Sequence, residues 1–104
     1  MATKDEAKRY LCNTSSEQCF WVNNGPILKN LEELANALPD MNDEIFNHHV
    51  NIEKNDFSNW VNGIIGDQKL ANDLLSSKNR DSAVKKIRSR LNSLKKKAGY
   101  KHEL

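Results

Sequence analysis

The sequence predicts an all-α fold, a small bundle of about five short helices with one short extended segment near the N-terminus. Two observations predict it: apolar residues recur at helical spacing in successive segments, and residues that typically begin or end helices separate these segments. A chain of 104 residues fits one domain. We expect residues 1–17 to form a disordered or loosely docked arm, residues 18–98 the helical domain, and residues 99–104 a flexible tail.

The extended segment lies at residues 18–22, a short apolar and aromatic stretch. Residues 23–26 (Asn-Asn-Gly-Pro) are a predicted turn, because Asn and Gly tolerate a positive φ and Pro fixes its own φ. The sequence shows no convincing second strand to pair with this segment. Side chains alternate along an extended chain, so Trp21 points outward if Phe20 and Val22 point inward.

The first predicted helix starts near Asn30, which has capping-box spacing to Glu33, and Pro39 ends it. Its apolar face comprises Leu28, Leu31, Leu34, Ala35 and Leu38. The second helix follows an N-cap at Asn42 or Asp43 and ends before a polar link at residues 51–54. It carries Ile45, Phe46, His49 and Val50.

The third helix opens at Asn55 and Asp56 and carries the clearest apolar stripe in the chain, at spacing i, i+3, i+4, i+7 and i+8. The stripe is Phe57, Trp60, Val61, Ile64 and Ile65. Gly66 then supplies a C-terminal stop, and Asp67 supplies the N-cap of a fourth helix. The apolar stripe of that fourth helix is Leu70, Ala71, Leu74 and Leu75.

The last helix runs from about Asp81 to Lys97, and Gly99 ends it. Its apolar residues fall on one narrow side, which fits a helix that packs on one side only. They are Val84, Ile87, Leu91 and Leu94. Over the whole chain, the predicted core is Phe20, Leu31, Leu34, Leu38, Phe46, Phe57, Trp60, Val61, Ile64, Leu70, Leu74, Val84, Ile87 and Leu91.

Charge is distributed unevenly along the chain, although the net charge is only +2. Residues 78–104 hold ten Lys or Arg against two Asp or Glu, whereas residues 1–77 hold six against twelve. This asymmetry indicates an interaction face on the last helix, and it also fits a solvated helix that the acidic part of the chain partly neutralises. The candidates for nucleic-acid contact are Lys85, Lys86, Arg88, Arg90, Lys95, Lys96 and Lys97.

Several short motifs follow one another between residues 20 and 71. They are Phe-Trp-Val at 20–22 before Gly25, Leu-Glu-Glu-Leu at 31–34, Phe46 with His-Val-Asn at 49–51, Asn-Asp-Phe-Ser-Asn-Trp-Val at 55–61, and Ile-Gly-Asp at 65–67 with Leu70 and Ala71. In this combination the stretch resembles a small microbial helical family known as a domain of unknown function. The resemblance implies a compact helical module, found alone or appended to other proteins, and implies no reaction.

The densest group of metal-ligand side chains surrounds His48 and His49. Adjacent residues diverge on a helix, so the two imidazoles do not suit one metal ion. We expect His49 to face inward and to hydrogen-bond a backbone carbonyl, Asp56 or Asp67. The two cysteines lie seven positions apart, which matches no zinc or redox motif and predicts two reduced thiols. We therefore predict no metal site and no cofactor.

The two tryptophans differ in their surroundings along the chain. Trp60 belongs to a regular apolar stripe, which predicts that it packs in the core. Trp21 precedes a turn on the extended segment, and we expect it on the outside. There it serves either as an anchor for a protein partner or as a lid over the bundle, and the sequence leaves both readings open.

No motif for catalysis is visible: the chain has no nucleophile elbow, phosphate loop, dinucleotide turn or usefully spaced carboxylate pair. The sequence therefore predicts a non-enzyme. No apolar run approaches the roughly 20 residues that span a bilayer. Residues 1–17 also lack the apolar core of a signal peptide. We accordingly expect a cytoplasmic protein that does not associate with membranes.

Two functions fit these observations. The first is a small non-enzymatic binding or adaptor module that acts through contact with an unidentified partner protein, with Trp21 as its candidate anchor. The second is sequence-nonspecific association with DNA or RNA through the basic helix at residues 80–97. Binding that weakens steeply with salt would separate the second from the first.

Overall fold

The structure, a computed structural model, describes residues 2–77 and 79–99. Within them the chain forms six α-helices and one two-stranded antiparallel sheet. The elements in chain order are α1 (Lys4–Tyr10), β1 (Phe20–Trp21), β2 (Ile27–Leu28), α2 (Leu31–Ala37), α3 (Asp43–His49), α4 (Asp56–Trp60), α5 (Gln68–Leu75) and α6 (Arg80–Ala98). The prediction of a mainly helical domain is therefore confirmed, but the structure adds a sixth helix and a second strand.

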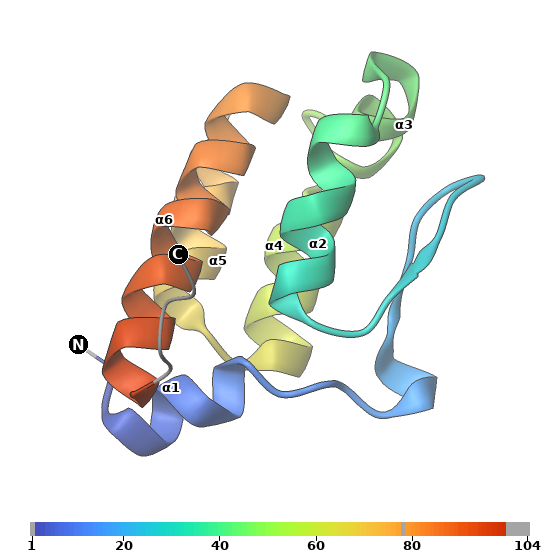
Figure 1. Ribbon diagram of the computed structural model, residues 1–104. Helices are drawn as coiled ribbons and strands as arrows, with labels where there is room; N and C mark the ends of the chain where they lie inside the picture. Colours follow the sequence, from blue (N-terminus) through green and yellow to red (C-terminus); the bar gives the residue numbers. More distant parts are fainter. Residues whose placement is uncertain (1, 78, 100–104) are drawn as a thin grey trace.

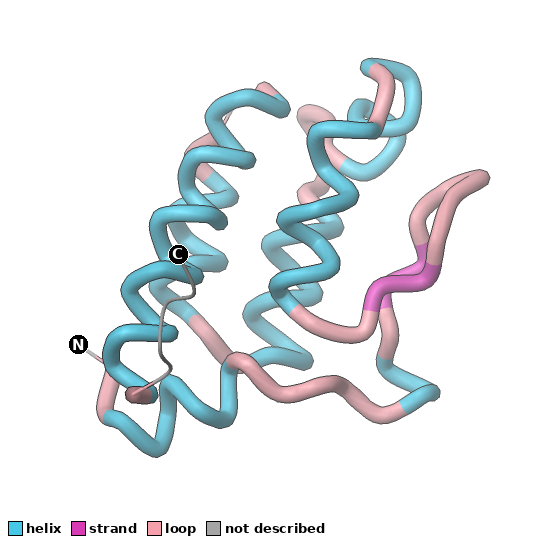
Figure 2. The backbone as a smooth tube through the Cα atoms, in the orientation of Figure 1, coloured by secondary structure: helices cyan, strands magenta, loops and turns pink. Residues whose placement is uncertain are grey.

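The helices gather around α6, which runs along one side of the molecule (Figure 1). Helices α1, α2 and α5 all pack against α6, and α4 packs against α5. The two strands form a hairpin on the other side of α2 (Figure 2). The buried side chains form one hydrophobic cluster to which every helix and both strands contribute.

Most helix starts and stops lie where the sequence predicts them. The side chains of Asn30, Asn42 and Asn55 each accept a hydrogen bond from the backbone N–H three residues on, at 2.8–3.0 Å. Gly66 adopts the left-handed conformation, with φ of 91°, where α4 and its continuation end. The N-cap of α6 is Asn79, two residues before the predicted start, and its side chain accepts from the N–H of Ser82 at 2.8 Å.

The N-terminal segment differs from the disordered or loosely docked arm that we expected, since Lys4–Tyr10 form α1. Thr3 and Glu6 cap this helix reciprocally: the Thr3 hydroxyl accepts from the Glu6 N–H, and the Glu6 carboxylate accepts from the Thr3 N–H. Ala7 is fully buried and Tyr10 nearly so. Helix α1 packs against α6, and only Ala7 and Tyr10 of its seven residues are buried, which explains why the sequence shows no clear period there.

The hairpin corrects a second expectation, that the extended segment has no strand partner. Phe20 pairs with Leu28 and Trp21 pairs with Ile27 in an antiparallel register. Leu28 was assigned to the face of the following helix, but it lies in β2 and is buried there. Asn24, with φ of 56°, lies at the turn between the strands, where Asn tolerates a positive φ.

The helix that begins with α4 changes its winding, and this corrects the predicted core. Val61–Ile65 form a π-helical turn, in which the Gly66 N–H donates to the Val61 carbonyl at 2.7 Å. A π turn rotates the following side chains away from α-helical positions. Ile65 is buried as a result, whereas Ile64 is 38% exposed and is not a core residue. Val84 is only half-buried, so it too lies at the edge of the core rather than in it.

A buried ion pair fixes α6 against α5. Asp67, which precedes α5, is 1% exposed, and its carboxylate accepts two hydrogen bonds from the Arg90 guanidinium at 2.8 and 2.9 Å. Asp67 also caps α5 by accepting from the Leu70 N–H at 3.2 Å. The bidentate geometry holds two planar groups in one relative orientation. The apolar side of α6 packs beside it, through Ala83, Ile87, Leu91, Leu94 and Ala98.

Breaking this pair should be strongly destabilising. Asp67→Ala leaves the Arg90 guanidinium buried without its carboxylate, and we expect the free energy of unfolding to fall by about 3–5 kcal/mol. Urea unfolding followed by circular dichroism measures this loss. Asp67→Asn combined with Arg90→Met removes both charges and should unfold at a higher urea concentration than Asp67→Asn alone. A double variant no more stable than Asp67→Asn would contradict the role that we assign to the pair.

Candidate functional site

Trp21 and Ile27 form an exposed apolar patch on the outer side of the hairpin, which we call the hairpin face. They are direct partners in the strand register, so both side chains leave the sheet on the same side. Trp21 is 70% exposed and Ile27 51% exposed, whereas their neighbours Phe20 and Leu28 are buried on the opposite side. The predicted outward direction of Trp21 is confirmed. Trp60 is buried, as expected, and its indole N–H donates to the Gln18 carbonyl at 2.8 Å.

His49 lies beneath the hairpin at the C-terminal end of α3 and is 4% exposed. Its Nε2 accepts a hydrogen bond from the backbone N–H of Asn23 at 3.0 Å, and its Nδ1 lies 2.9 Å from a carboxylate oxygen of Asp56. Because Nε2 accepts, it carries no proton, and a neutral ring must then carry its proton on Nδ1 and donate to Asp56. The ring packs against Phe20 and Phe57, with centroid distances of 5.0 and 5.3 Å. The inward direction of His49 is confirmed, and Asp56 rather than Asp67 is its partner.

Asp56 carries a second partner and is only partly buried. The Lys54 ammonium donates to the same Asp56 oxygen at 2.9 Å. Partial burial by itself raises the pKa of Asp56, but the hydrogen bonds from Lys54 and His49, together with the Lys54 charge, outweigh it and hold the pKa below its usual value. The carboxylate is therefore ionised at neutral pH and bridges α4 to α3 through His49.

The basic residues of α6 divide into two groups. Arg90 is held by Asp67, and the Lys95 ammonium lies 2.6 Å from the Glu32 carboxylate of α2. Within the residues that the structure describes, the other five candidates have no carboxylate at ion-pairing distance, and all five are exposed. These five are Lys85, Lys86, Arg88, Lys96 and Lys97. Two of the seven candidate cations are thus paired with carboxylates of the acidic part of the chain, as is Arg80 at the start of α6, which lies 3.6 Å from Asp43, and five face solvent.

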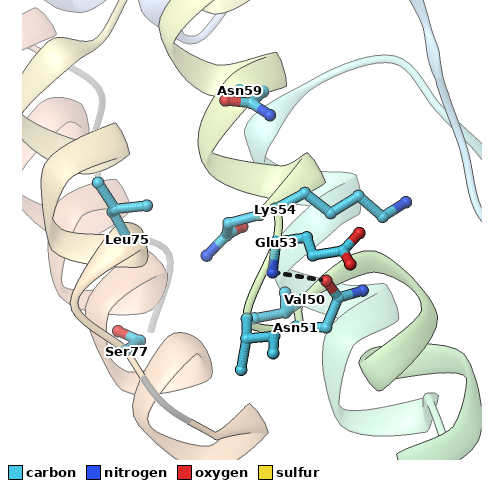
Figure 3. A pocket seen from close by; sticks show the side chains of 9 residues that line it. Val50, Asn51, Glu53, Lys54, Asn59, Leu75 and Ser77 are labelled. Atoms are coloured by element: carbon cyan, nitrogen blue, oxygen red, sulfur yellow. Dashed lines mark hydrogen bonds between the residues drawn. The ribbon is translucent and has the colours of Figure 1, made fainter.

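A depression of about 490 Å³ opens between the loop that joins α3 to α4 and the C-terminal end of α5. Figure 3 shows Glu53 and Lys54 on one side of it and Leu75 and Ser77 on the other. Leu75 is 62% exposed there. The lining mixes amide, charged and aliphatic side chains and stays open to solvent. It therefore lacks the enclosed apolar walls and converging polar groups that characterise a small-molecule site.

The other side chains that could bind a metal ion, Cys12, Cys19 and His48, do not form a cluster in the described part of the chain. Cys12 and Cys19 are unpaired thiols, and His48 is exposed beside His49. In residues 2–77 and 79–99, no three His, Cys, Asp or Glu side chains are grouped so that they could hold a metal ion. None of the helices in the same part of the chain is both long enough and apolar enough to cross a membrane.

Two residues of the site, Ile27 and Asn23, were not identified from the sequence. Ile27 belongs to no predicted element, and the backbone of Asn23 was not considered as a donor to His49. A signal for Ile27 exists, because the apolar pair at residues 27–28 follows the Asn-Asn-Gly-Pro turn, and two apolar stretches on either side of a turn that contains Asn-Gly are typical of a hairpin. The Asn23 contact has no such signal, since it joins residues 26 positions apart.

Comparison of the chain with protein-family models, with curated proteins and with solved structures found no match. The resemblance of residues 20–71 to a helical domain family therefore stays a prediction.

The lowered pKa of Asp56 makes part of the stability depend on pH. A carboxyl whose pKa is lower in the folded than in the unfolded state stabilises the fold above its unfolded value, about 3.9, and this contribution is lost as the pH falls through the folded value. Asp56→Asn keeps an oxygen acceptor for His49 but cannot ionise. We expect its unfolding free energy to fall less than that of the wild type as the pH drops from about 6 to about 3.

Urea titrations at several pH values test this expectation. Glu17→Gln, a change at an exposed carboxylate, serves as the control and should reproduce the wild-type acid dependence. Equal acid dependence in Asp56→Asn and the wild type would show that Asp56 adds nothing to stability by being ionised.

Proposed function

We propose that this chain is a small non-enzymatic binding module that contacts a partner protein through the hairpin face. One observation carries the proposal: Trp21 stands exposed beside Ile27, while Phe20 and Leu28 directly behind them are buried. A large aromatic side chain on a supported backbone loses little conformational freedom on binding, and such residues dominate protein interfaces. We place the protein in the cytoplasm, where its two unpaired thiols would remain reduced.

The chemistry of His49 supports the non-enzymatic part of the proposal. A histidine next to an aspartate can act as a general base when its second ring nitrogen is free to meet a substrate. Here the second nitrogen accepts the Asn23 N–H, and the ring is almost completely buried. Both ring nitrogens of His49 are therefore engaged in hydrogen bonds within the fold, and the His49–Asp56 pair has a structural role.

Removing the hairpin face should abolish partner binding without unfolding the protein. Trp21 and Ile27 are exposed, so each change to Ala should alter the unfolding free energy by only about 0.5 kcal/mol. We expect cross-linking and affinity capture with the wild type to retain a partner that Trp21→Ala with Ile27→Ala does not retain. Binding of that purified partner, measured by calorimetry, then confirms direct contact.

The matched control removes two other exposed apolar side chains elsewhere. Ile52→Ala with Leu75→Ala changes residues that line the depression between the α3–α4 loop and α5. This variant should bind the partner as the wild type does. The proposal is wrong if the two double variants lose the same partner, or if neither loses any.

A second candidate function is sequence-nonspecific nucleic-acid binding through α6. The observation that favours it is the placement of the free cations: two shallow grooves run along α6 and meet at Arg90 and Ser93. One is lined by Lys85 and Lys86, the other by Lys96 and Lys97. Lys86 and Lys97 are eleven residues apart, or about 16 Å along a helix. Lysines spaced in this way can meet several phosphates of one strand and release their counterions.

A charge reversal tests this candidate. Lys86→Glu with Lys97→Glu should weaken binding to mixed-sequence DNA and RNA and lower the slope of log affinity against log salt by about 2. The control is Lys8→Glu with Lys29→Glu, which changes the net charge by the same amount on α1 and before α2, outside both grooves. Fluorescence anisotropy at a series of salt concentrations measures both. Equal losses in the two variants would show that only net charge matters, and would refute a site on α6.

A further inference from the structure

The turn end of the hairpin is hydrogen-bonded to the helices through one titratable side chain, and Val22 just before it is buried in the core. Within the described residues, the only hydrogen bond between residues 23–26 and a helix is the one from the Asn23 N–H to Nε2 of His49. The base of the hairpin is held separately: the Trp60 indole N–H donates to the Gln18 carbonyl, and the Thr14 N–H donates to the Lys29 carbonyl at 2.7 Å. The turn end can therefore be released while the base stays attached.

We propose that His49 is a pH-sensitive latch: its neutral ring holds the turn end of the hairpin, and its protonated ring releases it. An imidazolium carries a proton on both nitrogens and accepts no hydrogen bond. After protonation, Nε2 and the Asn23 N–H are two donors facing each other, and the bond at 3.0 Å cannot persist. The ring is buried and Asn23 beside it is half-buried, so the Asn23 amide exchanges its partner for water only if the turn moves.

The titratable groups around His49 come from α3, α4 and the loop before α4, and Asp56 keeps the ring attached to the helices when the turn is released. Asp56, at the start of α4, accepts from Nδ1 in both protonation states, so the ring stays attached to the helices. Lys54, in the loop before α4, shares the same Asp56 oxygen and opposes a second positive charge there. His48 of α3 lies edge to face with the His49 ring, at 4.9 Å between centroids. The aromatic contacts of the ring given by β1 and α4, Phe20 and Phe57, carry no charge.

The latch matters for binding only if the hairpin face is the interaction surface proposed above, because Trp21 lies two residues before Asn23. Release of the turn would then leave Trp21 on a looser strand and weaken binding at acidic pH. The movement itself needs no partner. The two proposals can therefore fail independently.

Nuclear magnetic resonance of the full chain tests the latch without a ligand. The imidazole nitrogen shifts of His49 report its protonation and tautomer, and hydrogen exchange gives the protection of the Asn23 amide relative to an unstructured peptide at the same pH. Spectra recorded from about pH 8 to about pH 5 show at which pH His49 gains a proton. Protection of Asn23 should fall about tenfold in step with it, as for a lost hydrogen bond, while protection of the Thr14 amide is retained.

Two variants of neighbouring histidines make the assignment specific. His48→Gln removes the exposed imidazole and should leave the pH dependence of Asn23 unchanged. His49→Gln offers a side-chain oxygen that cannot titrate, and protection of Asn23 should then be the same at both pH values. If His49→Gln fails to fold, the wild type and His48→Gln still decide the question.

Three results would overturn the latch. His49 could remain neutral throughout the range, Asn23 could keep its protection while His49 is protonated, or the pH dependence could persist in folded His49→Gln. Failure to find a partner that needs Trp21 would refute the binding proposal and leave these measurements unaffected.

Discussion

The bidentate ion pair between Asp67 and Arg90 orients α6, and the arrangement of the other helices follows from that orientation. Asp67 lies in the core and Arg90 at its edge, and a buried charge is stable only if it is matched and hydrogen-bonded. Because the pair permits one relative placement of its two groups, it selects which side of α6 faces the protein. The apolar residues of α6 then meet α1, α2 and α5, and five cations that have no carboxylate partner among residues 2–77 and 79–99 are directed to solvent. Asp67 links this pair to the backbone by capping α5 at the same time.

The hairpin is held by weaker and more local contacts than α6. Phe20, Val22 and Leu28 insert into the core, and hydrogen bonds from Trp60 and to His49 fix its base and its turn. The inner residues of two very short strands thus anchor the outer pair, Trp21 and Ile27, on the surface. A two-stranded hairpin is marginally stable alone, so its order depends on the helices beneath it. Through this dependence, the protonation state of the buried His49 ring affects how firmly the exposed Trp21 side chain is held on the surface.

The hairpin face and the basic surface of α6 lie on different elements and offer different chemistry. The first is aromatic and aliphatic, and suits the apolar centre of a protein interface. The second consists of long cationic side chains and hydroxyls, and suits an anionic polymer. His49 and Asp56 lie beneath the hairpin, and they resemble a catalytic pair in their residue types but not in their accessibility. Both nitrogens of the ring are engaged by the protein itself, which explains how such a pair can be present without serving as a base.

Local features of the chain determined much of this structure by themselves. Capping residues and glycines act on backbone groups a few positions away, so the boundaries at Asn30, Asn55 and Gly66 could be predicted from the sequence. Strand alternation is equally local, and it gave Trp21 its outward direction. The inward direction of His49 followed from its place between apolar neighbours, and Asp56 was one of two acidic partners that the sequence allowed.

Tertiary structure decided the features that depend on distant residues. The pairing of β1 with β2, the docking of α1 and the choice of Asp56 over Asp67 for His49 all rest on contacts that only the packed chain creates. The π turn in Val61–Ile65 exposes Ile64, because the sequence period assumes uniform α-helical winding. Which cations of α6 are paired also depends on distant residues. In the sequence, Arg90 and Lys95 do not differ from Lys86 and Lys97. The fold distinguishes them, because it places the carboxylates of Asp67 and Glu32 beside Arg90 and Lys95.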